Sequence, residues 1–144
     1  MTLKQFIEIL EATAAKQAAV AQIVPQDVYR LNQIPDAKYG AFAWLHSGSG
    51  HEETIGAATR TLRFTLFYVD RLTEDKGNQL DIQSTGLEVL SNILRTLVYE
   101  HGDAVEIPTA VTYHPFLERF TDDCAGEFAD VAFEVDVNDI CEEL

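Results

Sequence analysis

The stretch AATRTLRFTLFYVDRLTEDKGNQLDIQSTGLEVLSNILRTLVYEHG, residues 57–102, contains the two clearest structural patterns of the chain. In its first part, large apolar side chains alternate with threonine and arginine, so that one face of an extended segment carries Leu62, Phe64, Leu66 and Tyr68. An alternation with period two is typical of an antiparallel strand that buries one face and exposes the other. The pattern predicts a strand over residues 57–70.

The second part of this stretch repeats a leucine every seven residues from Leu80 to Leu94. Further apolar residues fall on the same stripe, which is the spacing of an amphipathic helix. We predict a helix over residues 80–101. Asn78 is expected to cap its start, and Gly102 is expected to end it in a left-handed conformation.

The beginning of the chain predicts a second helix. Thr2 and Gln5 fit the capping-box pattern, in which each side chain satisfies a free backbone donor of the first turn. Apolar residues then follow at helical spacing and give way to an alanine-rich segment. We expect this helix to run to Val24, because the residue before Pro25 is pushed out of helical geometry.

Between this helix and the long strand, the sequence predicts a connection and one more strand. Residues 25–38 contain two prolines, and we expect an irregular connection there. The aromatic run over residues 39–46 favours a short strand, which would form a β-hairpin with the strand over residues 57–70. We expect one small domain to leave the aromatic edge Tyr39–Trp44 incompletely covered, which favours self-association.

After the long helix, the pattern predicts three strands. Two short strands are expected over residues 105–113 and 116–121, separated by a His-Pro pair, and a last strand over residues 127–138. Runs of strands combined with two helices predict an α+β fold. We expect one domain over residues 1–144, with an antiparallel sheet of four to five strands and both helices packed on one face.

Composition and charge exclude several classes of protein. The chain has 144 residues, of which 47% are hydrophobic and 24% are charged, as expected for one folded domain. It has no apolar run of the roughly 18 residues that a membrane span needs, and its start lacks the apolar core of a signal peptide, so we expect no membrane partner. The net charge of −14 argues against binding the nucleic-acid backbone, which cations recognise. Almost all of this charge lies in residues 100–144, which hold 13 acidic residues and one basic residue.

No spacing in the sequence is typical of a catalytic or metal site. The four histidines lie in different predicted elements, and the His-Glu-Glu run at residues 51–53 is expected to be solvated. The loop Ser47–Gly50 lacks the lysine of a phosphate-binding loop, and no helix follows it. The Asp-Asp pair at residues 122–123 is expected to form an exposed turn, and the two cysteines are expected to be reduced thiols. We therefore expect no enzymatic activity, no metal and no cofactor.

Two segments, FTLFYVDRLTEDKGNQLDIQSTGLEVLSNIL (residues 64–94) and FLERFTDDCAGEFADVAFEVDVNDIC (residues 116–141), carry a resemblance to a known family. The shared features are a strand that ends in Asp-Arg-Leu, a polar turn with asparagine, a long helix, and then Phe-x-Asp and a small turn before an alternating final strand. With these features the chain resembles small tail-module proteins of tailed bacteriophages and prophages, particularly those of Bacteroidetes. The order of its elements is similar to that of the tail terminator, or tail-completion, family.

This resemblance implies a structural virion protein rather than an enzyme. Members of the family form rings, usually homohexamers, that cap a finished tail tube and join it to the neck. The implied partners are other copies of the chain, the tail tube protein and a neck or connector protein, with DNA passing through the channel as unbound cargo. The implied location is the tail or neck of the virion, after synthesis in the cytoplasm of the host bacterium.

Two alternative functions stay open at this point. The first is another head–tail joining or neck protein with a similar small α+β fold. The second is a non-viral α+β domain that binds a small ligand, or acts on it, in a cleft beside the sheet.

Two groups of residues are candidates for the contacts that a ring needs. Period two places three carboxylates of the last strand on one face, and together with a glutamate at its start they form the candidate channel lining: Glu127, Asp130, Glu134 and Asp136. Two polar loops that contain glycine are the candidate interface arms: Ser47, Gly48, Ser49, Gly50, His51 and Glu52 in the first, and Arg71, Glu74, Asp75 and Lys76 in the second. The alternative for the first group is a solvated outer face of the sheet, which Arg60 and Arg63 partly neutralise.

Overall fold

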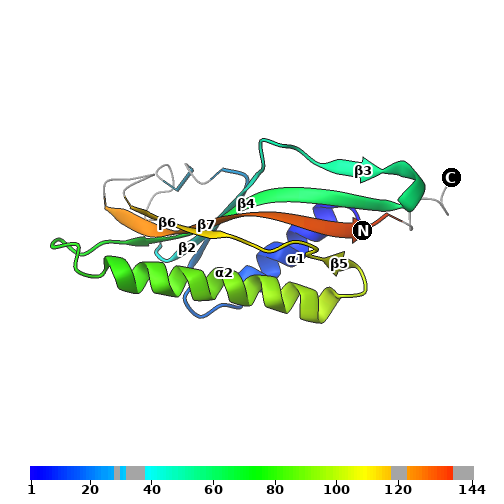
Figure 1. Ribbon diagram of the computed structural model, residues 1–144. Coiled ribbons are helices and arrows are strands. Elements are labelled where there is room, and N and C mark those ends of the chain that lie inside the picture. Colours follow the sequence, from blue (N-terminus) through cyan, green and yellow to red (C-terminus); the bar gives the residue numbers. More distant parts are fainter. Residues whose placement is uncertain (28–29, 32–37, 118–122, 138–144) are drawn as a thin grey trace.

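The computed structural model describes residues 1–27, 30–31, 38–117 and 123–137. The elements in chain order are α1 (Leu3–Ala15), β1 (Gln22–Val24), β2 (Ala41–His46), β3 (Glu52–Thr54), the short 3-10 helix η2 (Ile55–Ala57), β4 (Thr59–Arg71), α2 (Gln79–His101), β5 (Val105–Glu106), β6 (Tyr113–Leu117) and β7 (Cys124–Asp136). Figure 1 shows one sheet with the two helices beneath it. The predicted α+β class is confirmed.

The long pair β4–β7 forms the centre of the sheet. These strands of 13 residues each are paired along their whole length, from Thr59 opposite Asp136 to Arg71 opposite Cys124. The strand order is β1-β2-β4-β7-β5, while β3 pairs with β4 and β6 pairs with β7. The sheet therefore has seven strands rather than four to five, and it is mixed because β1 runs parallel to β2. The two strands that were not predicted, β1 and β3, have three residues each, too few to produce a period-two pattern in the sequence.

Helix α1 starts as predicted and ends earlier. The backbone N–H of Gln5 donates to Thr2 Oγ1 over 3.1 Å, and the N–H of Thr2 donates to Gln5 Oε1 over 2.8 Å, so the capping box is confirmed. The helix ends at Ala15 rather than at Val24. Its expected last turn instead forms β1, where pairing with β2 satisfies backbone groups and Val24 is fully buried. This burial and pairing outweigh the high helix propensity of the alanine-rich segment, because propensities differ by less than about 1 kcal/mol per residue.

Helix α2 forms over nearly the predicted range, and both of its ends differ from expectation. Asn78 holds the N-cap position without a side-chain hydrogen bond to the helix. Its Oδ1 accepts from the Thr73 N–H over 2.9 Å and its Nδ2 donates to the Arg71 carbonyl over 3.1 Å, so the preceding turn uses this side chain. Gly102 follows the helix with a right-handed φ of −64°, so the expected left-handed stop is wrong.

The strands after α2 also depart from the predicted boundaries. β5 is only two residues long, and β6 includes Pro115, which was expected to lie between two strands. Proline is tolerated there because β6 is an edge strand and needs no donor on its outer side. β7 begins at Cys124, which is buried, three positions before the predicted start. Several predicted features lie outside the described residues: residues 118–121 of the second short strand, Asp122, Asn138 and Cys141.

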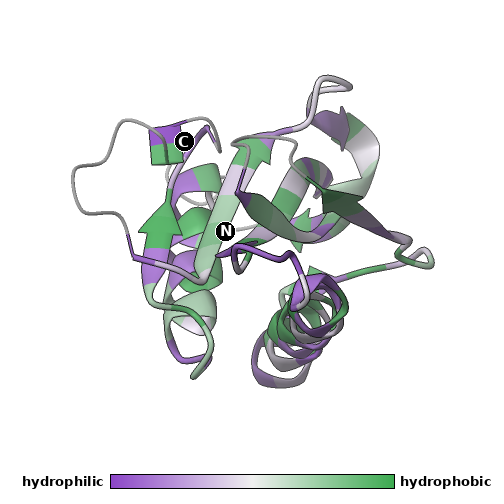
Figure 2. Cartoon of the chain, turned by 90° about the vertical axis from the view of Figure 1, so that its left-hand side faces the viewer, coloured by the Kyte–Doolittle hydropathy of each residue, from purple (hydrophilic) through white to green (hydrophobic). Residues whose placement is uncertain are grey.

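Both helices contact the same face of the sheet. Figure 2, which looks along the axis of α2, shows this helix below the sheet with hydrophobic and hydrophilic residues around it. Side chains of α1, α2, β4 and β7 form one buried cluster, which includes Phe6, Leu10, Leu62, Phe64, Leu90, Ile93 and Phe133. The ring of Phe6 lies 4.7 Å from that of Phe133 and 5.5 Å from that of Phe64. Even residues of β4 and odd residues of β7 thus form the covered face.

The opposite face of the sheet is apolar at one end and polar at the other. The apolar end holds a second buried cluster, whose members include Val24, Ala43, Phe67, Val69, Phe116 and Cys124. The edge at Tyr39–Trp44, expected to be incompletely covered, is not open: Phe42 and Trp44 are at most 1% exposed. Strands β1 and β4 flank β2, and Trp44 Nε1 donates to Glu11 Oε2 of α1 over 2.9 Å. The polar end, beyond Thr65, carries the residues described next.

Candidate functional site

The polar end of the uncovered face carries a row of carboxylates on β7. Asp130, Glu134 and Asp136 project from this side, and each lies directly opposite a threonine of β4, respectively Thr65, Thr61 and Thr59. They alternate along the strand with the buried side chains of Val131, Phe133 and Val135. Asp130 is exposed, and the other two are half-buried. The structure thus brings these three predicted residues together on one face.

A fourth carboxylate joins them from β5. Glu106 is paired with Glu134 in the β5–β7 register, and its side chain is exposed. The sequence did not single out Glu106, because no alternation in residues 105–113 indicates which strand it pairs with. Like charges directly opposite each other destabilise a pair of strands, so this arrangement does not serve stability. We call the set Glu106, Asp130, Glu134 and Asp136 the acidic strip.

The arginines that were considered as neutralising partners are engaged elsewhere. Arg60 points to the other face of the sheet, where its guanidinium lies 2.7 Å from Glu53 Oε1. Arg63 shares the face of the acidic strip, and its Nη1 donates to the Gly50 carbonyl over 3.3 Å while its Nη2 lies 3.4 Å from Glu52 Oε2. Among the described residues, no carboxylate of the acidic strip takes part in an ion pair. No side chain described in the structure therefore neutralises the strip, and the N-terminal ammonium donates to the Asp136 carbonyl over 2.7 Å at one end of it.

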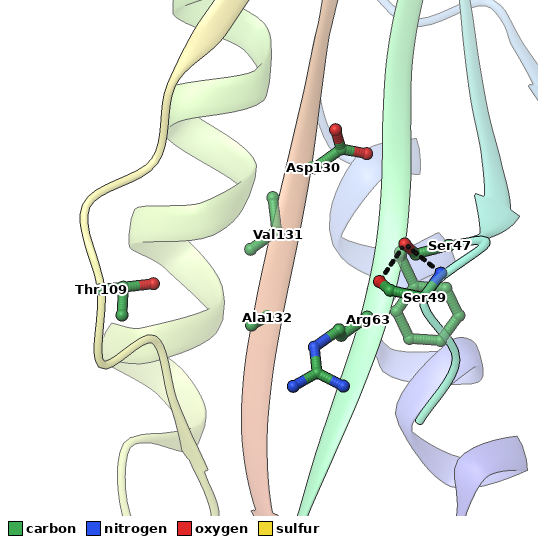
Figure 3. A pocket seen from close by; sticks show the side chains of 8 residues that line it. Ser47, Ser49, Arg63, Thr109, Asp130, Val131 and Ala132 are labelled. Atoms are coloured by element: carbon green, nitrogen blue, oxygen red, sulfur yellow. Dashed lines mark hydrogen bonds between the residues drawn. The ribbon is translucent and has the colours of Figure 1, made fainter. Parts of the chain in front are cut away.

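A small hollow lies at the Asp130 end of the acidic strip. Figure 3 shows Asp130 on β7, Arg63 on β4, Thr109 on one side and two serines on the other. Thr65 Oγ1 donates to Asp130 Oδ1, and the hydroxyls of Ser47 and Ser49 are 2.8 Å apart. The hollow has a volume of ≈ 140 Å³, well below the roughly 300–1,000 Å³ of small-molecule pockets. It is too small to serve as a substrate pocket.

Two larger grooves lie on the surface away from the acidic strip. One, of ≈ 550 Å³, runs between α2 and the segment before β6 and is lined by Leu94, Arg95, Val98, Tyr99 and Tyr113, among others. The other, of ≈ 450 Å³, runs between α1 and β2 and includes Ile7, Glu8, Glu11, Trp44 and His46. Both are open grooves rather than enclosed cavities, and this shape suits contact with a protein surface better than enclosure of a small ligand.

Glu127 does not belong with the other three candidates on β7. An odd position places it on the covered face, beside Tyr68 and under Gly86 of α2, where an added Cβ would lie 3.2 Å from the Glu127 side chain. It is 6% exposed, and its Oε2 has no hydrogen-bond partner. Burial raises the pKa of this carboxyl, while the nearby His114 lowers it. The prediction that Glu127 contributes to one acidic surface is therefore wrong, because period two separates it from Asp130.

The first predicted interface arm is attached to the sheet rather than free. His51 Nε2 lies 3.1 Å from His46 Nδ1, and the backbone N–H of Arg63 donates to His51 Nδ1 over 3.1 Å. The His51 ring also lies 5.5 Å from that of Phe64. Glu52, predicted in the loop, belongs to β3 and pairs with Thr61. The sequence analysis placed His46 and His51 in separate elements. The predicted hairpin of residues 39–46 and 57–70 is the signal that could have indicated their proximity.

The paired histidine nitrogens do not form a metal site. Because His51 Nδ1 accepts the Arg63 N–H, the neutral ring carries its proton on Nε2, the atom that faces His46. A metal ion between the rings would need the lone pair of this same Nε2. Within the described part of the chain, no group of three or more histidine, cysteine, aspartate or glutamate side chains could hold a metal ion.

The second predicted interface arm is a turn with its own hydrogen bonds. Asp75 Oδ1 accepts from Thr73 Oγ1 over 2.7 Å and from the Gly77 N–H over 3.0 Å, and these bonds lower the pKa of the Asp75 carboxyl. The Arg71 guanidinium lies 4.8 Å from the centre of the Tyr39 ring. Glu74 and Lys76 are exposed. Both arms thus make hydrogen bonds to the sheet or within the turn, and exposed side chains lie at their tips.

No protein-family model matches the chain, and no curated protein matches it. None of the helices in the described ranges is long and apolar enough to cross a membrane. The geometry of the acidic strip and of the two arms is therefore the basis on which a function can be proposed.

Proposed function

We propose that the chain is a structural virion protein that forms a ring of identical subunits, caps the tail tube of a tailed bacteriophage and joins it to the neck. In this proposal the acidic strip lines the channel through which DNA passes. The observation that carries it is the strip itself: four carboxylates on an uncovered sheet face, with no ion pair among the described residues and with Glu106 opposite Glu134. The resemblance of residues 64–94 and 116–141 to tail-module proteins supports the same assignment.

The electrostatics of a DNA channel favour such a surface. Duplex DNA carries one negative charge per about 1.7 Å of its axis, and cations bind it by releasing counterions. A wall of carboxylates repels the phosphates and so lets DNA move without being held. The cost of placing like charges opposite each other is acceptable where the surface serves transport rather than stability.

Exposed apolar side chains supply surfaces for contacts between subunits. Ile55 at the tip of the β3–β4 hairpin is 80% exposed, Leu80 at the start of α2 is 76% exposed, and Tyr99 near its end is 91% exposed. They lie on two elements, the β3–β4 hairpin and α2, so two separate surfaces are available for a head-to-tail interface. Such an interface closes into a ring when its rotation permits.

The direct test is the assembly state of the purified chain, measured by light scattering and negative-stain electron microscopy over a range of concentrations. We expect rings with a central hole, and a mass that corresponds to a closed oligomer. A monomer at every concentration, both alone and with preformed tail tubes, would contradict the proposal. A monomer that binds a small ligand would favour the non-viral alternative, and a ring that binds the connector but no tube would favour another neck protein.

A second test asks whether the acidic strip faces the channel. Asp130→Lys, Glu134→Lys and Asp136→Lys in one chain should make the ring retain duplex DNA, with an affinity that falls steeply as salt rises. The matched control carries Asp81→Lys, Glu88→Lys and Asp103→Lys, which change the net charge equally at exposed positions outside the acidic strip and the two interface arms. Equal DNA retention by both variants would show that the strip does not line the channel.

A further inference from the structure

We propose that the His46–His51 pair is a pH-sensitive latch: it holds the loop of residues 47–51 against β4 while both rings are neutral, and releases the loop when either ring is protonated. The proposal stands on the contacts of this loop and does not depend on ring formation. Two hydrogen bonds form the latch, from Arg63 N–H to His51 Nδ1 and between His51 Nε2 and His46 Nδ1, each 3.1 Å long.

The protons of the latch can be assigned atom by atom. A backbone N–H can only donate, so His51 Nδ1 is an acceptor and the ring proton of neutral His51 is on Nε2. This Nε2–H donates to His46 Nδ1, so the proton of neutral His46 is on its own Nε2. The lone pairs of His51 Nδ1 and His46 Nδ1 then each accept a hydrogen bond.

An added proton has no position that preserves both hydrogen bonds. On His51 Nδ1 it would face the Arg63 N–H, donor against donor. On His46 Nδ1 it would face the His51 Nε2–H in the same way. Protonation of either ring therefore breaks one bond of the latch and places a positive charge beside the remaining bond.

The surroundings of the His51 ring also oppose its protonation. Burial lowers the pKa of His51, and so do the charges of His46, Arg63 and Arg60. Across the groove beside His46, helix α1 contributes one cation and two carboxylates: Lys4, Glu8 and Glu11. Glu11 accepts from Trp44, and the carboxylates of β3 are paired with the two arginines. Because the closed state binds a proton on His51 less tightly than the open state does, the latch is stable above the ordinary histidine pKa of about 6.5 and weakens as the pH falls.

Opening of the loop also has a consequence for the acidic strip. The closed loop places the Gly50 carbonyl 3.3 Å from Arg63 Nη1, while Glu52 next to it lies 3.4 Å from Nη2. Arg63 and Asp130 line the same hollow (Figure 3). A guanidinium released from the loop can pair with Asp130, so the latch couples acidic pH to partial neutralisation of the strip.

The test is a histidine titration by NMR, with amide exchange of Arg63 measured in the same samples. Between about pH 7.5 and pH 5, we expect the His51 ring signals to shift, with a midpoint below the ordinary histidine pKa because burial lowers the pKa of this ring. The protection of the Arg63 amide, corrected for the intrinsic exchange rate, should fall by on the order of 10-fold, which is the weight of one ordinary hydrogen bond. The amide of Phe133, which lies in the buried core of β7, is the internal reference, and its corrected protection should not change over this pH range.

Two variants separate the latch from a merely structural loop. His51→Asn keeps an acceptor near the position of Nδ1 and cannot be protonated, so the protection of the Arg63 amide should no longer depend on pH. His46→Ala removes the neighbouring charge, so the pKa of His51 should rise towards its ordinary value. The matched control His114→Asn should behave as the wild type. Constant protection of Arg63 while both rings titrate, or an unchanged pH response in His51→Asn, would overturn the proposal.

Discussion

Strands β4 and β7 present two different surfaces to their two sides. On the covered side, alternate residues such as Phe64 and Phe133 are fully buried in one cluster with side chains of both helices. On the other side, the half of the pair beyond Thr65 carries mainly threonines and carboxylates, and neither α1 nor α2 covers it. The same backbone therefore carries the stability of the fold on one face and a charged surface on the other.

Two glutamates of β7 show how completely the face decides the role of a side chain. Glu127 and Glu134 are seven positions apart on one strand, which places them on opposite faces. Glu134 is half-buried among other carboxylates and threonines, whereas Glu127 is buried under α2 with an unpaired oxygen. Burial of an unpaired carboxyl costs free energy, while a solvated one costs little, so identical residue types are expected to respond differently to substitution.

The largest difference in the free energy of unfolding is expected between substitutions of Phe133 and of its neighbour Glu134. Phe133→Ala should lower the free energy of unfolding by about 3–5 kcal/mol, because it leaves a cavity between the rings of Phe6 and Phe64. Glu134→Ala should change it by no more than about 0.5 kcal/mol. Urea denaturation of the two variants measures both values. Similar losses of stability in the two variants would contradict the burial of one face and the exposure of the other.

A smaller effect, of opposite sign, is expected at Glu127. Glu127→Met should raise the free energy of unfolding at neutral pH by on the order of 1 kcal/mol, because it removes a buried acceptor without a partner. Glu134→Met, on the same strand and the other face, is the matched control and should change little. Equal effects of the two substitutions would contradict the burial of Glu127.

The pH dependence of the same pair sharpens this prediction. Burial raises the pKa of Glu127 in the folded protein, so the folded state binds this proton more tightly than the unfolded chain does. The stability contributed by the protonated form is fully present below the ordinary pKa of 4.5 and is lost as the pH rises through the raised value. The advantage of Glu127→Met over the wild type should therefore grow from acidic to neutral pH. An advantage that shrinks over this range would exclude the raised pKa.

The smallest effect is expected within the acidic strip. Glu106→Gln should raise the free energy of unfolding by about 0.2–1 kcal/mol at low salt, because it removes the repulsion between Glu106 and Glu134. The gain should nearly vanish at about 1 M salt, where the screening length is about 3 Å. Glu88→Gln on the exposed side of α2 is the control, and thermal unfolding at two salt concentrations is the measurement. A gain that salt does not change would argue against repulsion as its cause.

Much of the fold could be predicted because its main signals are local. The alternation in β4 and β7 and the seven-residue repeat of α2 each lie within one segment, and the structure has these elements close to the predicted ranges. The shared face of Asp130, Glu134 and Asp136 follows from the same alternation. The assignment of Glu127 was the exception, because it was grouped with the others by its place in the chain rather than by its parity.

Other features depend on contacts between distant segments and could not be predicted in this way. The end of α1 at Ala15 depends on the parallel pairing of β1 with β2. The position of Glu106 beside Glu134 depends on a register that two residues of β5 establish with β7. The engagement of Arg60 and Arg63 by Glu53 and Glu52 depends on the short strand β3, which carries no pattern of its own.

The amino-acid sequence by itself determined the α+β class, the long central strands, the long helix and the excess of negative charge in the last third of the chain. These are properties of periodicity and composition, which backbone geometry converts directly into faces of helices and strands. Only the tertiary structure decided which carboxylates share a surface, which of them is buried, and that His46 and His51 meet across a loop. The environment of each side chain depends on the register of the strands and on the close approach of α2 to the sheet at Gly86. Both result from the packing of the whole chain.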